Sequence, residues 1–112
     1  MASVDECRQA LNDLAARMAE NAAEVRSRVD LERTLACRIK DLDTAFHGRL
    51  VDGQLVDLAD GDDPKAKIAI SIASDDLLAL VRGELDFPRA LAARRVSISA
   101  NPLDLMKLRK MM

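Results

Sequence analysis

Apolar residues recur at spacings of three and four through the first quarter of the chain. This period predicts a helix over residues 3–28 with an apolar stripe along one face, made of Val4, Cys7, Leu11, Leu14, Met18 and Val25. Ser3 followed by Glu6 is typical of a capping box at a helix start. The stripe either packs against its own chain or forms a seam with a second chain, in which Asn21 would set the register.

The pattern then changes to strict alternation, which predicts β-strands. Residues 33–42, 44–51 and 54–60 are three strand candidates, and the dipeptide Asp52-Gly53 favours a type I′ hairpin turn between the last two. Isoleucine alternates with small residues over 67–73. Because both faces of this fourth segment are apolar or small, we expect it to lie centrally in the sheet.

The last third of the sequence predicts short helices around one more strand. Ser74 is a candidate N-cap and Gly83 a candidate C-cap of one helix, while Pro88 suits the first turn of a second helix over 88–93. Residues 95–100 alternate as a strand, and an apolar helix begins at Pro102.

This order predicts an α+β fold: about five strands in a mainly antiparallel sheet, covered by helices on one face, with an N-terminal helix and an apolar C-terminal helix. The 112 residues suit a single domain over 1–112. Within it, 1–29 would form the N-terminal helix, and 30–112 would hold the sheet and the C-terminal helices.

Composition argues against a nucleic-acid partner. Seventeen basic and nineteen acidic residues give a net charge of −2, whereas nucleic-acid binders usually carry a basic excess. Two Phe, with no Trp or Tyr, do not make a base-stacking platform. The chain has no apolar run of membrane-spanning length and no signal-peptide pattern at its start, so we expect a cytoplasmic protein.

The sequence offers little for catalysis or metal binding. Cys7 and Cys37 lack metal-ligand spacing, and we expect two reduced thiols, with a disulfide as the alternative. His47 is the single histidine, and we expect it at the surface or at a strand edge without a catalytic role. The acidic loop at 60–66 lacks the distal Glu of a calcium loop. We therefore predict a non-enzymatic protein without a metal or cofactor.

One ordered series of segments resembles a known family. A strand ending in "DG", the acidic turn "DGDDPKA", the strand "KIAISIA", the helix "SDDLLALVRGELD", the strand "RVSISA" and the helix "NPLDLMKLRKMM" follow one another within residues 31–112. The series resembles the sterol carrier protein type 2 family of lipid-binding domains, as a divergent bacterial relative. The family often has Gly where this chain has Ala93 and Arg94, and Ala and Arg adopt a left-handed backbone poorly. Family members also often have Gly after the fifth strand, where this chain has Ala100 and Asn101.

The resemblance implies a five-stranded sheet packed against helices, with an apolar tunnel between the sheet and the C-terminal helices. In the family this tunnel takes fatty acids, acyl-CoA or sterols, and the domain has no catalytic residues of its own. The ligand-binding candidates are Leu35, Ile39, Phe46, Leu78, Val81, Phe87, Leu91, Leu103, Met106, Leu108 and Met111. The candidates for contact with a head group or a membrane surface are Arg94, Arg95, Lys107 and Lys110.

Apolar composition alone leaves a second interpretation open. A C-terminal helix rich in Leu and Met either forms a flexible door over a tunnel or covers a filled core. In the second case the chain would be a ligand-free interaction module, or a homodimer formed through the N-terminal helix.

Overall fold

A five-stranded sheet is the centre of the computed structural model, which describes residues 2–21 and 32–110, with side chains from 107 onward excepted. The strands, in the order β3-β2-β1-β4-β5, are β1 (Arg33–Ile39), β2 (Thr44–Val51), β3 (Gln54–Asp60), β4 (Ile68–Ile72) and β5 (Val96–Ser99). Every neighbouring pair is antiparallel except β1 with β4. The predicted mainly antiparallel α+β sheet is confirmed, with the isoleucine-rich β4 in an interior position.

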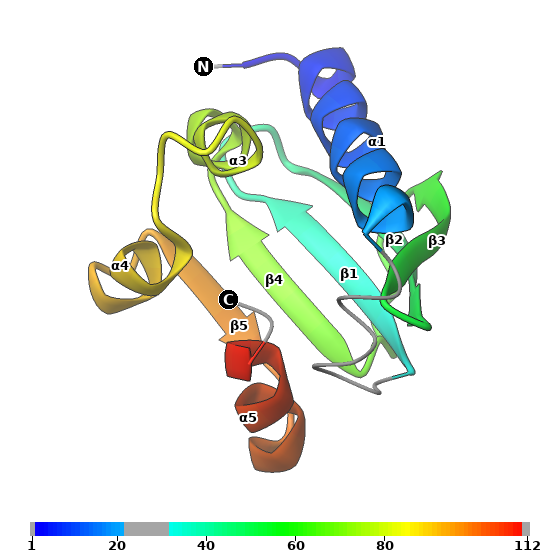
Figure 1. The fold of residues 1–112 in the computed structure, drawn as a ribbon. Helices are drawn as coiled ribbons and strands as arrows, with labels where there is room; N and C mark the ends of the chain where they lie inside the picture. Colours follow the sequence, from blue (N-terminus) through cyan, green and yellow to red (C-terminus); the bar gives the residue numbers. More distant parts are fainter. Residues whose placement is uncertain (1, 22–31, 111–112) are drawn as a thin grey trace.

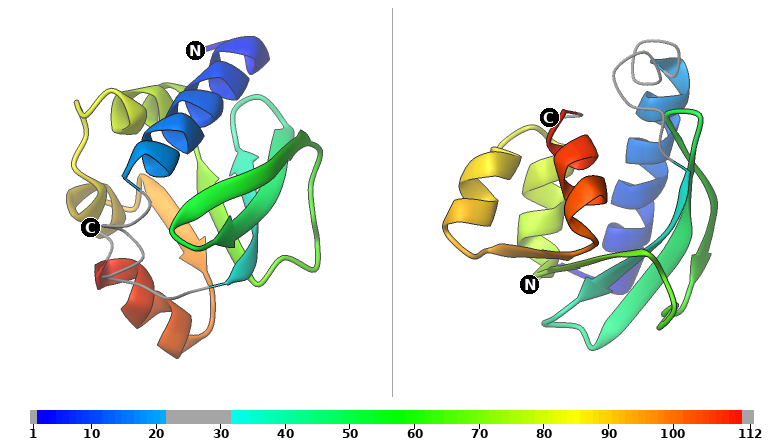
Figure 2. Two further views of the ribbon diagram at one scale, coloured as in Figure 1. Left: turned by 45° about the vertical axis from the view of Figure 1, so that its right-hand side comes forward. Right: turned by 90° about the horizontal axis from the view of Figure 1, so that it is seen from below.

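The four helices formed by the described residues lie on one face of this sheet (Figures 1 and 2). They are α1 (Val4–Glu20), α3 (Ser74–Val81), α4 (Phe87–Ala92) and α5 (Pro102–Lys110). The capping box of Ser3 and Glu6 forms as predicted. Asn21 is the C-cap of α1, and the predicted continuation of this helix to residue 28 lies outside the described residues, as does the predicted boundary at 29/30.

The apolar stripe of α1 packs inside its own chain. Cys7 and Leu11 are buried in the main core, Leu14 packs against that core, and Met18 packs against a smaller cluster built on Leu50 and Ile68. The helix contacts α3 and β3. The described part of the stripe is therefore used within the chain, while Val25 lies outside the described residues.

The predicted hairpin turn between β2 and β3 forms. Asp52 and Gly53 both have positive φ, +53° and +75°, as a type I′ turn requires. Arg94 also has a positive φ, +61°, at the position where the family often has Gly. Asn101 does not adopt this conformation; its side-chain oxygen accepts a hydrogen bond from the backbone N–H of Asp104 and so caps α5.

The predicted N-cap at Ser74 was wrong. Ala73 is the N-cap of α3, without a side-chain hydrogen bond, and Ser74 is its first helical residue. The Ser74 hydroxyl is buried and donates to Asp41, 2.6 Å away, while the backbone N–H of Ala2 donates to it at 3.1 Å. A tertiary hydrogen bond therefore replaces the local cap and joins the N-terminus, the β1–β2 turn and α3.

Candidate functional site

An apolar cavity of about 270 Å³ lies between the helix-covered face of the sheet and the helices. Its walls come from α1, β1, β3, β4, α3, the segment before α4 and the first residue of α4. The lining residues are Leu11, Leu14, Leu35, Cys37, Leu55, Ile70, Ile72, Leu77, Leu80, Val81, Leu85 and Phe87. No charged side chain is among them.

The strand register builds the sheet wall. Cys37 of β1 pairs with Ile70 of β4, and two residues along each strand Ile39 pairs with Ile72, so these side chains share one face. β2 lies between β3 and β1 but contributes no lining residue. Its Gly48 leaves room for Leu55 of β3: a Cβ on Gly48 would lie 3.4 Å from Leu55 Cδ1.

The helix wall follows from the spacing of apolar residues on two helices. Leu77, Leu80 and Val81 lie three and four positions apart on α3 and face the sheet with Leu11 and Leu14 of α1. Leu85 and Phe87 extend this wall toward α4. The helix wall is therefore as apolar as the sheet wall.

Cys37 carries the one heteroatom among the lining side chains. Burial raises the pKa of its thiol to about 12, and the nearby Cys7 adds to the shift. Burial also raises the pKa of Cys7, with Asp41 contributing. Both thiols are free, as expected, and at neutral pH Cys37 presents an uncharged, weakly polar surface to the cavity.

The cavity includes three of the residues expected to bind a ligand: Leu35, Val81 and Phe87. Ile39 and Phe46 are 1% exposed and belong to the solid core beside it. Leu91 packs at the edge of that core. Leu78 lines a separate groove between α1 and α3.

The candidates near the C-terminus lie away from the cavity where they are described. Leu103 and Met106 of α5 are 71% and 60% exposed. Arg94 is exposed, and Arg95 forms an ion pair with Asp76. Met111 and the side chains of Lys107, Leu108 and Lys110 lie outside the described part of the chain.

Sequence reasoning did not single out nine of the twelve lining residues as ligand contacts. They are Leu11, Leu14, Cys37, Leu55, Ile70, Ile72, Leu77, Leu80 and Leu85. The signal was present in the alternation of β1 and β4 and in the stripe of α1, which predicted buried faces. It did not show which buried residues border an open space.

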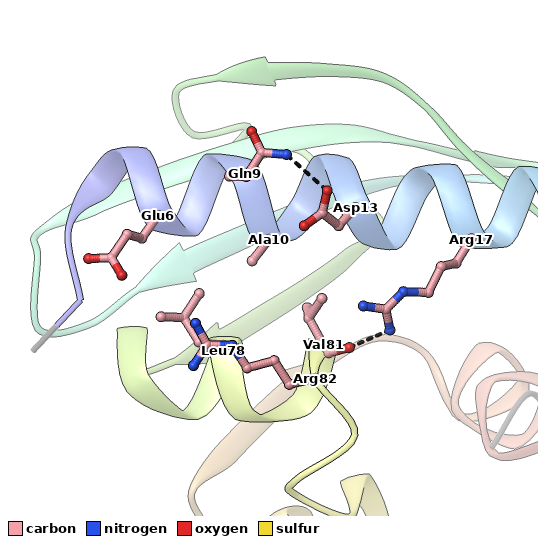
Figure 3. A pocket seen from close by; sticks show the side chains of 8 residues that line it. All are labelled: Glu6, Gln9, Ala10, Asp13, Arg17, Leu78, Val81 and Arg82. Carbon is pink, nitrogen blue, oxygen red and sulfur yellow. Dashed lines mark hydrogen bonds between the residues drawn. The ribbon is translucent and has the colours of Figure 1, made fainter.

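A second, smaller pocket of about 170 Å³ lies in the groove between α1 and α3 (Figure 3). Arg17 donates to the carbonyl oxygen of Val81 there, and Gln9 donates to Asp13 at 2.9 Å. Glu6 and Arg82 also line it, so charges of both signs meet in this groove. Because charged and polar side chains line most of it, this groove is less suited than the cavity to an apolar ligand.

Outside the cavity and the groove, the described residues show no arrangement that suits catalysis or metal binding. Nδ1 of His47 lies 2.9 Å from the carbonyl oxygen of Gly61. Residues 2–21 and 32–110 bring together no group of three or more His, Cys, Asp or Glu side chains that could hold a metal ion. None of the described helices is long and apolar enough to cross a membrane.

Comparison with known protein families shows to which family this chain belongs. The sequence matches the family described as alkyl sulfatase C-terminal over residues 4–112. The chain belongs to this family. No curated protein sequence matches this alkyl sulfatase C-terminal domain.

Solved structures show the same fold. A stereoselective inverting sec-alkylsulfatase from Pseudomonas sp. is 23% identical with a TM-score of 0.63; the match covers 88% of this chain and 14% of that enzyme. A sterol carrier protein domain of Helicoverpa armigera is 14% identical with a TM-score of 0.73, covering 95% and 84%. Palmitated SCP2L2 of Aedes aegypti is 14% identical with a TM-score of 0.60, covering 96% and 91%.

The alkyl sulfatase C-terminal domain therefore has the sterol carrier protein 2 fold, and the resemblance inferred from the sequence is confirmed. The chain spans about one-seventh of the length of the alkylsulfatase that it matches.

Proposed function

We propose that this domain binds an apolar ligand, such as a fatty acid, an acyl chain or a sterol-like lipid, in the cavity between the sheet and α1 and α3, without catalysing a reaction. The observation that carries the proposal is the lining of the cavity, which has eleven hydrocarbon side chains and one neutral thiol. Such a surface recognises a ligand by shape and by removal of apolar area from water, with no need of a hydrogen-bonding group.

The expected energetics agree with a carrier. Burial contributes about 0.8 kcal/mol for each CH₂ group, so ten such groups contribute on the order of 8 kcal/mol before the costs of association. Those costs amount to at least about 4 kcal/mol, which leaves about 4 kcal/mol or less, equivalent to millimolar or weaker binding. Binding of this strength is reversible, as transfer of a ligand requires.

The fold relatives support the class of ligand. One of them is a palmitated protein with the same fold, and several others are sterol carrier proteins. The relation to an alkylsulfatase fits the same chemistry, since an alkyl chain is an apolar ligand. We propose that an apolar chain is the ligand feature common to the sterol carrier proteins and the alkylsulfatase.

Native mass spectrometry of the freshly purified protein, combined with organic extraction, tests the proposal. A bound mass of a few hundred daltons that disappears on extraction would support it. An unliganded mass, together with no binding of a fluorescent fatty acid, would contradict it. The variant Leu80→Trp places an indole in the cavity and should abolish uptake. Leu91→Trp is the matched control, because Leu91 does not line the cavity.

We also propose that α5 contacts an anionic membrane surface. Leu103 and Met106 are exposed three positions apart on this helix, and the sequence continues with Lys107, Arg109 and Lys110. Exposed apolar residues with neighbouring cations are typical of helices that lie in a lipid interface. Co-sedimentation with vesicles rich in phosphatidylserine should fall for the double variant Leu103→Ser, Met106→Ser. Equal co-sedimentation of the variant and the parent would contradict the contact.

A further inference from the structure

The size of the cavity limits the ligand more closely than its apolar lining does. A protein cavity of about 150 Å³ is enough for benzene, which has six carbons. By proportion, the 270 Å³ here hold about eleven carbon atoms. A sixteen-carbon chain such as palmitate would need about 400 Å³ by the same comparison.

The lining also indicates the shape of the space. Sheet residues that border it come from β3, β1 and β4, which stand three inter-strand spacings apart, or about 14 Å. Since Gly48 has no side chain on the intervening β2, Leu55 reaches the cavity across that strand. A volume of this size that crosses the sheet suits a single extended chain better than a fused-ring system.

Among the described residues, the side chains that line the cavity offer no partner for a polar head group. All lining side chains are hydrocarbon except the Cys37 thiol, and burying a carboxylate or a hydroxyl without a hydrogen bond is costly. The head group of a bound amphiphile must therefore stay at the rim, in water. The cavity should therefore discriminate between ligands by the length of the chain and not by the chemistry of the head group.

From these three observations we infer that the ligand is an unbranched alkyl chain of medium length, about ten to twelve carbons, held with its polar head outside the cavity. This inference rests on the proposed function, which it narrows from apolar ligands in general to one class. It also separates this domain from its palmitated fold relative, whose ligand chain is longer.

Displacement of a fluorescent apolar probe by alkanoates and by alkan-1-ols, each from six to sixteen carbons and below micelle concentrations, tests the inference. Affinity should rise about fourfold with each added CH₂ up to a break near ten to twelve carbons, and then stay level or fall. Both series should break at the same length.

A rise that continues to sixteen carbons would overturn the length limit and leave the proposed function intact. Breaks at different lengths would overturn the placement of the head group. No displacement by any chain would overturn the proposed function as well.

If the cavity volume sets the chain length at which affinity stops rising, substitutions of the lining residues should change that length. Leu80→Ala and Leu85→Ala each remove three side-chain carbons from the lining, so the break should move to longer chains by about three carbons. Leu91→Ala makes the same chemical change outside the cavity and should leave the break in place. Circular dichroism confirms that each variant is folded before titration. A folded lining variant with an unmoved break would overturn the inference.

Discussion

Arg33, at the first position of β1, donates from Nε to Oδ2 of Asp104 in α5 across 3.0 Å. The carboxylate is 1% exposed, whereas the guanidinium side chain is 36% exposed. The two residues are separated by 71 positions in the sequence, and their ion pair joins the C-terminal helix to the sheet. The burial is one-sided, so the two partners should differ in their contribution to stability.

Replacing Arg33 should cost more than replacing Asp104. Arg33→Met leaves a buried carboxylate without its partner, and we expect the free energy of unfolding to fall by about 3 kcal/mol. Asp104→Asn removes the buried charge and leaves a guanidinium that water can reach, so the expected loss is about 1 kcal/mol. Urea denaturation of the two variants checks the difference. Equal losses would show that solvent reaches Asp104.

Arg94→Gly should stabilise the domain. Arg94 holds a φ of +61° in the turn before β5, where a side chain is strained and Gly is not. We expect a gain of about 1 kcal/mol in the free energy of unfolding. Ala93→Gly is the matched control: its φ is −83°, so added chain entropy should cost about 0.5–1 kcal/mol there. Thermal denaturation of both variants gives the comparison, and a loss in both would argue against strain at Arg94.

Local patterns predicted the fold because the physics that sets strands, hairpins and caps acts over a few residues. The alternation in β4, the Asp52-Gly53 turn and the Ser3 capping box each depend on neighbours in the chain, and each forms. Ser74 shows the limit of this reasoning. By residue type and position Ser74 fits the local rule for an N-cap. In the fold, Asp41 lies close enough to accept a hydrogen bond from its hydroxyl, and Ser74 does not cap the helix.

The cavity could be predicted only in part, since it is defined by what the helices fail to fill. Leu35, Val81 and Phe87 were expected from the sequence, whereas Leu55 and Leu80 depend on how β3 and α3 are placed. Period-two and period-four patterns predict a buried face, but they do not say whether another side chain fills the space in front of it. The apolar composition of α5 likewise did not show that Leu103 and Met106 would lie on its exposed side.

Gly48→Ala should destabilise the sheet through a steric conflict. The added Cβ would lie 3.0 Å from the carbonyl oxygen of Val56, which backbone pairing holds in place, and 3.4 Å from Leu55 Cδ1. We expect a loss of about 2 kcal/mol in the free energy of unfolding, with weaker uptake of the probe because Leu55 must move. In Gly83→Ala nothing lies within 4 Å of the added atom, but its φ of +76° should cost about 1 kcal/mol. A normal probe affinity in the Gly48 variant would contradict the role of Leu55 in the wall.

Ser74→Ala should lower stability in a pH-dependent way. The Ser74 hydroxyl and backbone N–H lower the pKa of Asp41 below its ordinary 3.8 in the folded protein. A lowered folded-state pKa stabilises the fold above the unfolded pKa, and this contribution disappears as the pH falls through the folded-state value. The free energy of unfolding of the parent should therefore exceed that of the variant by the largest amount above pH 3.8. This difference should shrink as the pH falls below that value. Urea denaturation at pH 7 and in strong acid gives both values.

The control for this measurement is Ser71→Ala, which removes a hydroxyl from the opposite face of β4 to the cavity. Its effect on stability should be the same at both pH values. A Ser74→Ala effect that is equally independent of pH would show that the hydroxyl acts through its bond with the Ala2 N–H and not through Asp41.

The two buried thiols report separately on the cavity and on the core. Cys37 lines the cavity, whereas Cys7 lies in the adjoining core, so Cys7→Ala and Cys37→Ala leave a single thiol in each place. With a pKa of about 12, Cys37 is almost wholly protonated at pH 8, and iodoacetamide should label it slowly until urea unfolds the chain. A saturating medium-chain alkanoate should slow the labelling of Cys37 in the native protein more than that of Cys7. Equal protection of both thiols would contradict direct contact between the ligand and Cys37, because a molecule in the cavity covers Cys37 directly and Cys7 only through the packing around it.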